Sequence, residues 1–228
     1  GTAAPQDVVE GMRKLADEHD TLLMFDEIVS GFRMATDGAQ GYYGVTPDLA
    51  VFAKGIANGM PLAAVCGKKE VMECAKDLVI SITYGGEALS LAAASVCLDV
   101  YKSEPVIEHM FRQGDKLRHG FEASAASCGV PFKCHGPACM HSMSFDYQDA
   151  KLNTKVWTLF LQETARRGVL LRRGGLLFIT YSHDDEAIEQ TIAAVAETMP
   201  LIAEAVEAGQ VEERLQTGEV EESFRRFT

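Results

Sequence analysis

The stretch from Thr21 to Pro61 constrains the fold most, because it holds two short apolar segments that each lead into charged side chains. The first segment, residues 22–25, reads Leu-Leu-Met-Phe and is followed by Asp26 and Glu27. A short apolar run between polar residues is typical of a buried strand. We therefore expect Asp26 at the C-terminal end of a strand, at the sheet edge where open α/β folds bind their ligands.

The second segment, residues 48–53, reads Asp-Leu-Ala-Val-Phe-Ala and leads into Lys54. If it forms the neighbouring strand, an acid and an amine face one cleft at the same sheet edge. Gly55, Gly59 and Pro61 follow the lysine. They suit a backbone that turns tightly and lies close to a ligand.

These residues belong to a longer pattern that resembles the pyridoxal-phosphate signature of class III aminotransferases. It comprises Phe-Asp-Glu-Ile at 25–28, Gly-Phe-Arg at 31–33, Gly-Ala-Gln at 38–40, Tyr-Tyr-Gly-Val-Thr-Pro-Asp-Leu at 42–49, Lys54, and Gly-Met-Pro at 59–61. Within that class the chain is most similar to the branch that contains glutamate-1-semialdehyde aminomutase and polysaccharide-associated aminotransferases. The resemblance implies the C-terminal half of a fold-type I subunit, without the glycine-rich phosphate loop of the first half.

The resemblance also implies pyridoxal 5'-phosphate as the cofactor and a role for four residues. Asp26 would hold a proton on the pyridine nitrogen, because a carboxylate favours the charged form of a base beside it. Lys54 would form the Schiff base with the cofactor aldehyde and later move a proton. Ile28 would pack on the cofactor ring. Thr83 would contact the cofactor phosphate of the neighbouring subunit, which makes the active site a property of a homodimer.

The residues around Thr83 give an independent reason to expect an anion there. Gly85 and Gly86 precede a long alanine-rich helix that we expect at about residues 88–101. Backbone amides at a glycine-rich helix entrance are placed to hold an anion. An ordinary loop before a helix is the alternative interpretation.

The sequence predicts two domains in an α/β chain. Pro105 stops the preceding helix, so we expect residues 1–104 to be the C-terminal half of a cofactor-binding large domain and residues 105–228 a small α+β domain. The large domain should also contain a helix at 5–19, a strand at 62–66 and a short helix at 68–76. In the small domain we expect helices at 106–126, 154–167, 184–206 and 211–215, and an antiparallel sheet from the apolar runs 139–145, 169–171 and 176–181. Arg172 could bind a substrate carboxylate through two parallel hydrogen bonds, or could belong to an exposed hairpin.

Composition excludes several classes of function. The net charge of -12 argues against nucleic acid as a partner, because phosphates would be repelled. No apolar run of eighteen residues and no secretion signal occur, so we expect a cytoplasmic protein that does not bind membranes. The six cysteines are expected to be reduced. Cys134, His135, Cys139 and His141 lack the paired spacing of a structural zinc site, so we expect no metal.

The function that these observations favour is transfer of an amino group from a small-molecule donor to a keto or aldehyde acceptor. An aminomutase, which moves the amino group within one molecule, would use the same residues and stays open. A P-loop ATPase also has an apolar strand ending in Asp-Glu, but no G-x-x-x-x-G-K-[ST] motif occurs in this sequence. A dimerising fragment that binds no cofactor is the third alternative.

Overall fold

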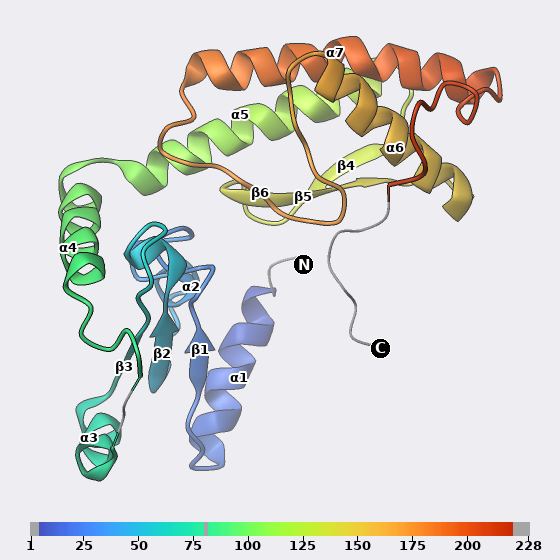
Figure 1. Cartoon of the computed structure of the whole chain (residues 1–228). Coiled ribbons are helices and arrows are strands. Elements are labelled where there is room, and N and C mark those ends of the chain that lie inside the picture. Colours follow the sequence, from blue (N-terminus) through green and yellow to red (C-terminus); the bar gives the residue numbers. More distant parts are fainter. Residues whose placement is uncertain (1–4, 80–81, 221–228) are drawn as a thin grey trace. The chain divides into compact units, whose positions relative to one another are not determined.

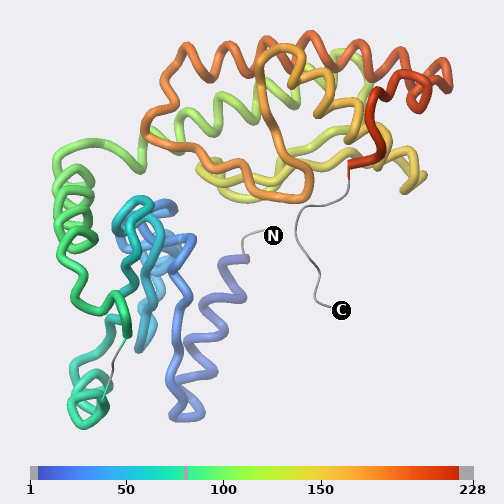
Figure 2. Tube along the Cα trace, viewed as in Figure 1, coloured from blue at the N-terminus to red at the C-terminus, as the bar shows by residue number. Residues whose placement is uncertain are grey.

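The computed structural model describes residues 5–79 and 82–220, and the chain divides into two compact units. The first unit ends at His109 and the second begins at Met110. The first is coloured blue to green and the second green to red in Figures 1 and 2. The two units are described separately below.

The first unit is built on a three-stranded sheet in the order β1-β2-β3. Strand β1 (Met24–Asp26) pairs in parallel with β2 (Leu49–Phe52), and β2 pairs antiparallel with β3 (Ala64–Gly67). The helical elements are α1 (Gln6–Glu18), α2 (Ala39–Tyr43), the 3-10 turn η1 (Lys54–Ile56), α3 (Lys69–Glu73), the 3-10 turn η2 (Cys74–Asp77) and α4 (Ala88–Ser103).

Helix α1 lies alongside β1 in Figure 1 and is tied to the sheet by Asp48. This nearly buried carboxylate accepts from Arg13 Nη1 at 2.8 Å, from the Leu23 backbone N–H at 2.7 Å and from Lys68 Nζ at 2.6 Å. Three donors compensate the loss of water around the charge, so Asp48 can be buried where β2 begins. The face of α1 that carries Val9 and Ala16 is buried.

The second unit packs helices on a three-stranded antiparallel sheet in the order β4-β5-β6. The strands are β4 (Phe132–His135), β5 (Met140–Phe145) and β6 (Leu177–Phe178). The helices are α5 (Val106–Ser127), whose first turn belongs to the first unit, α6 (Ala150–Arg166) and α7 (Asp185–Glu207). Tilted and edge-on aromatic contacts fill the core, through Phe121, Phe132, Phe145, Trp157 and Phe160.

Most elements agree with the sequence prediction, with specific exceptions. The predicted strand at 169–171 is wrong: these described residues form no strand, since they continue the segment after α6 towards a turn. The predicted helix at 211–215 is also wrong, because this segment makes turns with isolated hydrogen bonds such as Leu215 N–H to Glu212 C=O. Strand β4 and the short helix α2 were not predicted, and α6 starts at Ala150 rather than 154.

Within the described ranges, no helix is long and apolar enough to cross a membrane.

Candidate active site

Asp26 is the last residue of β1, and its side chain is exposed. In the parallel ladder Asp26 lies opposite Val51, which is followed in β2 only by Phe52. Asp26 Oδ1 accepts a hydrogen bond from the Ile28 backbone N–H at 3.0 Å. This hydrogen bond leaves the carboxylate accessible. Asp26 thus lies at the C-terminal end of its strand, as the sequence predicted.

Lys54 follows β2 at the same edge and begins the turn η1. Its side chain is exposed, and its backbone is left-handed with φ 47°. For a residue with a Cβ this conformation costs roughly 1–2 kcal/mol, so the surroundings must enforce it. The Lys54 carbonyl accepts from the N–H groups of Ala57 (3.3 Å) and Asn58 (2.9 Å), and Asn58 is itself left-handed with φ 44°.

Phe32 connects the segment after β1 with the segment after β2. Its ring packs against Phe52 at 5.7 Å and against Tyr101 of α4 at 5.4 Å. The Tyr101 hydroxyl donates to the Phe32 carbonyl at 2.9 Å. A Cβ added to Gly55 would lie only 3.2 Å from the Phe32 Cβ, so the residue after Lys54 passes directly over Phe32.

Glu27 is a functional candidate to which sequence reasoning gave no role. It has no exposed surface, although it directly follows the exposed Asp26. Its carboxylate accepts from the backbone N–H groups of Ala39 (2.7 Å) and Gln40 (2.9 Å) and from the Ser30 hydroxyl. The signal in the sequence was a second acid at the strand end, followed by a loop that contains Gly31, Gly38 and Gly41. A buried carboxylate needs several hydrogen-bond donors, and the backbone of such a loop can supply them.

The segment around Thr83 corrects one prediction. Thr83 is exposed in the turn before α4. However, the Glu87 carboxylate caps α4, accepting from the N–H groups of Leu89 (2.8 Å) and Ser90 (2.7 Å) and from the Ser90 hydroxyl (2.5 Å). These bonds lower the pKa of Glu87, the Ser90 hydroxyl most of all. Two amides expected to hold an anion are therefore occupied by the chain's own carboxylate.

The remaining candidates have different surroundings. Ile28 is half-buried next to Asp26. Arg172 belongs to the second unit, where it is exposed and its guanidinium lies over Gly175. Its neighbour Arg173 has a structural role, since it donates to the Val220 carbonyl at 2.6 Å. The first unit brings Asp26, Ile28 and Lys54 to one edge of its sheet. Arg172 lies in the second unit.

The cysteines and histidines at 134, 135, 139 and 141 lie in the second unit, where both histidines contact neighbouring polar groups. His135 Nε2 lies 2.9 Å from Ser144 Oγ, and His141 Nδ1 lies 3.2 Å from the Ala138 carbonyl. Burial, with a smaller contribution from Glu122, raises the pKa of Cys134 to about 12, which disfavours the thiolate that metals bind. Among the described residues no group of three or more possible ligands could hold a metal ion.

The comparisons with known proteins identify the class of protein. The model of the family "Aminotransferase class-III" matches residues 1–199, and the chain therefore belongs to this family. The chain is 35% identical to a glutamate-1-semialdehyde 2,1-aminomutase of Roseiflexus castenholzii, over 92% of this chain and 51% of that protein. It is 33% identical to a 3-aminobutyryl-CoA aminotransferase of Cloacimonas acidaminovorans, over 84% of this chain and 46% of that protein.

Solved structures agree with this assignment. The PLP form of the FumI protein of Sphingopyxis sp. MTA144 superimposes with a TM-score of 0.83 and 26% identity, over 91% of this chain and 49% of that one. An omega-transaminase from Sphaerobacter thermophilus, 21% identical, shares the fold with a TM-score of 0.77 over 88% of this chain and 49% of that one. The α/β fold is thus that of PLP-dependent transaminases, and the chain spans about half the length of the relatives it matches.

Proposed function

We propose that this chain supplies the cofactor-binding acid and the reactive lysine of a PLP-dependent aminotransferase. The reaction would transfer an amino group from a small-molecule donor to a keto or aldehyde acceptor. The observation that carries the proposal is the position of Asp26 and Lys54 in a chain of the class III family: Asp26 ends β1, and Lys54 follows the adjacent parallel strand β2 at the same sheet edge. One acid and one amine, both exposed, fit the donor set that pyridoxal phosphate requires.

Asp26 has the position and chemistry to hold a proton. When bound, pyridoxal phosphate withdraws electrons from the substrate carbon that loses its proton. The Asp26 carboxylate would stabilise the positive charge of the protonated pyridine nitrogen by charge pairing. Its hydrogen bond from the Ile28 N–H fixes one oxygen and leaves the other for the cofactor. Ile28 itself is proposed to pack on the cofactor ring.

Lys54 is proposed to carry the covalent and proton-transfer work. Its amine would hold the cofactor by a covalent bond to the aldehyde carbon, with release of water, and, once displaced by the substrate amine, would act as the base that takes up and returns one proton. The left-handed backbone and the bonded turn η1 give the side chain a fixed starting point. Thr83 is proposed to bind the cofactor phosphate of a partner subunit through its hydroxyl, and Arg172 to bind a substrate carboxylate.

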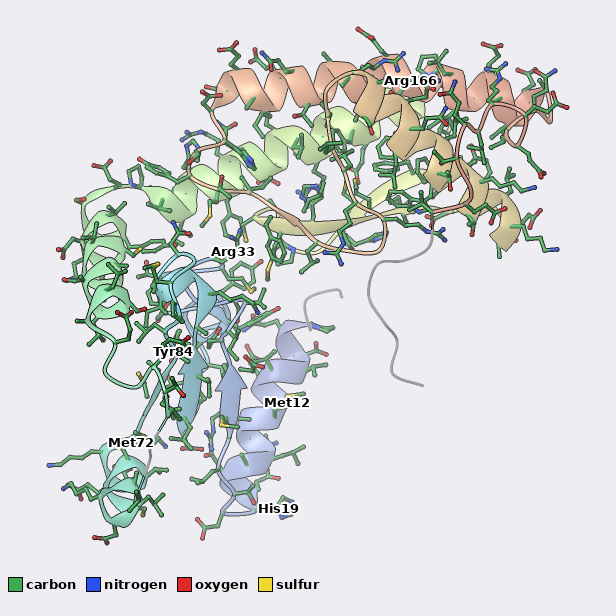
Figure 3. The ribbon with its side chains drawn as sticks, viewed as in Figure 1. Met12, His19, Arg33, Met72, Tyr84 and Arg166 are labelled. Atoms are coloured by element: carbon green, nitrogen blue, oxygen red, sulfur yellow. The ribbon has the colours of Figure 1, made fainter. Side chains whose placement is uncertain are left out.

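Exposed apolar surface supports a second polypeptide segment as a partner of the first unit. Met24 and Val65 lie on the same sheet face as Asp26 and are 59% and 54% exposed. On α1, Met12, which is labelled in Figure 3, is 49% exposed, and Leu15 is 57% exposed. Parallel strands are normally covered on both faces. We propose that these surfaces contact the other half of a class III subunit and that the complete enzyme is a homodimer with shared active sites.

We propose that the chain comprises parts of two domains of the enzyme. Residues 1–104 would form the C-terminal half of the cofactor-binding domain, and residues 105–228 the small α+β domain. The six cysteines are free, which is compatible with the proposed cytoplasmic location.

An amino-transfer assay tests the function. The chain would be assayed alone and co-expressed with the part of the Roseiflexus castenholzii relative that it does not match, with pyridoxal phosphate, an amino acid and a keto acid. We expect transfer in the co-expressed form. Conversion of glutamate-1-semialdehyde without a second substrate would instead establish the aminomutase, which the name of that relative favours. If the co-expressed form assembles but shows neither reaction, the proposal is wrong and a non-catalytic fragment is left.

A further inference from the structure

We propose that Glu27 is a positioning residue for Lys54, acting through the loop that joins β1 to α2. The inference rests on the proposed function of Lys54 and extends it to Glu27, a residue with no exposed surface. Its basis is a continuous series of contacts within the first unit, which runs from the Glu27 carboxylate to the turn η1.

The series begins with the buried carboxylate of Glu27. An ionised carboxylate without water is costly unless several donors surround it. Here the Ser30 hydroxyl and the N–H groups of Ala39 and Gln40 converge on it from both ends of the loop. At Gly38, which is left-handed with φ 88°, a side chain would collide with the Glu27 carboxylate. The loop is therefore closed tightly around Glu27.

The second step passes through the Glu27 backbone. Its carbonyl accepts from the Gly31 N–H at 2.9 Å. A Cβ on Gly31 would lie 2.6 Å from a ring carbon of Phe52 and 2.7 Å from the Glu27 carbonyl oxygen. The turn from Glu27 to Gly31 thus lies directly on the last residue of β2.

The third step leads from Phe32 to Lys54. Phe32 is left-handed with φ 59°, and it is held between Phe52, Tyr101 and the backbone of Gly55. Strained residues such as Phe32 and Lys54 keep their conformations only when their surroundings over-determine them. The loop around Glu27 provides that restraint, because it sets where Phe32 lies and Phe32 limits where Gly55 can pass.

The test is Glu27→Gln, which keeps the shape but replaces one acceptor oxygen with an amide donor facing backbone N–H groups. The matched control is Glu163→Gln. Glu163 is also buried and satisfied by several donors, including Arg166 and Arg167, but it belongs to the second unit. Both variants lose a buried carboxylate, and only one of them loses contact with the loop.

The first readout is hydrogen exchange of the protein without cofactor, at the Ala57 and Asn58 amides that bond to the Lys54 carbonyl. We expect Glu27→Gln to accelerate their exchange roughly tenfold relative to the amides of α1, and Glu163→Gln to leave the ratio unchanged. If Glu27→Gln does not fold, Ser30→Ala removes one donor from the same carboxylate and should act in the same direction. An unchanged ratio in the folded variant overturns the proposal.

The second readout is the absorption of the covalent adduct of Lys54 with added pyridoxal phosphate, as a function of pH. Glu27→Gln should shift the pH midpoint by roughly half a unit or more, because the lysine nitrogen is less fixed, and Glu163→Gln should not shift it. A wild-type midpoint in Glu27→Gln contradicts the positioning role. If neither the wild-type chain nor its co-expressed form makes the adduct, the proposed function fails, while the exchange ratio still decides whether Glu27 controls the turn.

Discussion

Asp26 lies opposite Val51 in the parallel pair of β1 and β2, and Val51 precedes Lys54 by only three positions in the chain. Parallel pairing makes both strands end at the same edge, so two residues far apart in sequence emerge together. An antiparallel pair would have placed them at opposite edges. The site proposed here depends on this relationship.

The first prediction concerns the charge of Asp26. Asp26→Asn should lower the amino-transfer rate about 100-fold or more, because the neutral amide no longer stabilises a proton on the cofactor nitrogen. Steady-state kinetics of the co-expressed enzyme measures this. Asp99→Asn is the control, since Asp99 is an exposed acid of α4 that pairs with Lys102 at 3.7 Å. Equal rates for the two variants would contradict the role of Asp26.

The second prediction separates two adjacent arginines. Arg172→Gln should raise the KM for a carboxylate substrate about tenfold with little change in melting temperature, because a bidentate contact would be lost. Arg173→Gln should mainly lower the melting temperature, since Arg173 donates to Val220 C=O and to Thr154 Oγ1 at 3.1 Å. Kinetics and thermal melting of both variants distinguish the roles. A raised KM in Arg173→Gln alone would reverse the assignment.

Much of the fold could be predicted because local patterns decide it. Helices α1, α4, α5 and α7 follow from apolar spacing and from Pro105, and the strand ends of β1 and β2 from apolar runs before Asp26 and Lys54. Strand β4 was missed because its sequence, Phe-Lys-Cys-His, is short and polar, and only its pairing with β5 makes it a strand. The run at 169–171 is apolar, but it pairs with no strand in the part of the chain that the structure describes.

The site was predictable only in its accessible members. Asp26 and Lys54 could be proposed because they belong to the pattern that resembles the class III aminotransferase signature. Glu27 could not be assigned because its role depends on Ala39 and Gln40, which are distant in sequence and reach it only when the loop folds back. Glu87 was overlooked as a cap because the glycines before it indicated an open anion site.

The third prediction is acid sensitivity arising from Asp48. The Lys68 ammonium, then the Leu23 N–H and Arg13, hold the pKa of Asp48 well below its ordinary value of about 3.9. The unfolded chain therefore binds more protons, and the stabilisation is complete above about pH 4 and is lost as the pH falls further. Asp48→Asn should melt roughly 3–6 °C lower at pH 7 and lose this acid-dependent part.

The control for Asp48 is Asp17→Asn. Asp17 binds the same Arg13, at 2.6 Å, but its side chain is 64% exposed. Exposed ion pairs contribute little to stability, so this variant should melt close to the wild type, both at pH 7 and below about pH 4. If Asp17→Asn and Asp48→Asn lose equal stability, the buried position of Asp48 is not what matters.

The fourth prediction concerns His141, which has no exposed surface in the second unit. Burial is the main cause that lowers its pKa; Arg118 lowers it further, whereas the Ala138 carbonyl, Glu122 and Asp115 oppose the shift. The folded chain thus keeps His141 neutral while the unfolded chain takes up a proton near pH 6.5. Stability should be complete above that pH and fall below it, by at most about 1.4 kcal/mol per pH unit.

Chemical unfolding at several pH values tests this prediction. His141→Gln should remove the part of the slope below about pH 6.5 that one proton accounts for. His119→Gln, which replaces a histidine at an exposed position of α5, is the control for the substitution itself. A wild-type slope in both variants would mean that His141 does not titrate differently on folding.

The most direct test of the central claim is peptide mapping after pyridoxal phosphate and borohydride are added to the protein. Reduction fixes the cofactor on the lysine to which it is bound. We predict a yellow absorption band, a reduced adduct on the peptide that carries Lys54, and loss of both in Lys54→Ala, together with a loss of transfer activity on the order of 10³-fold or more. An adduct on another lysine, or none in the chain and in its co-expressed form, would contradict the assignment of Lys54 as the reactive amine.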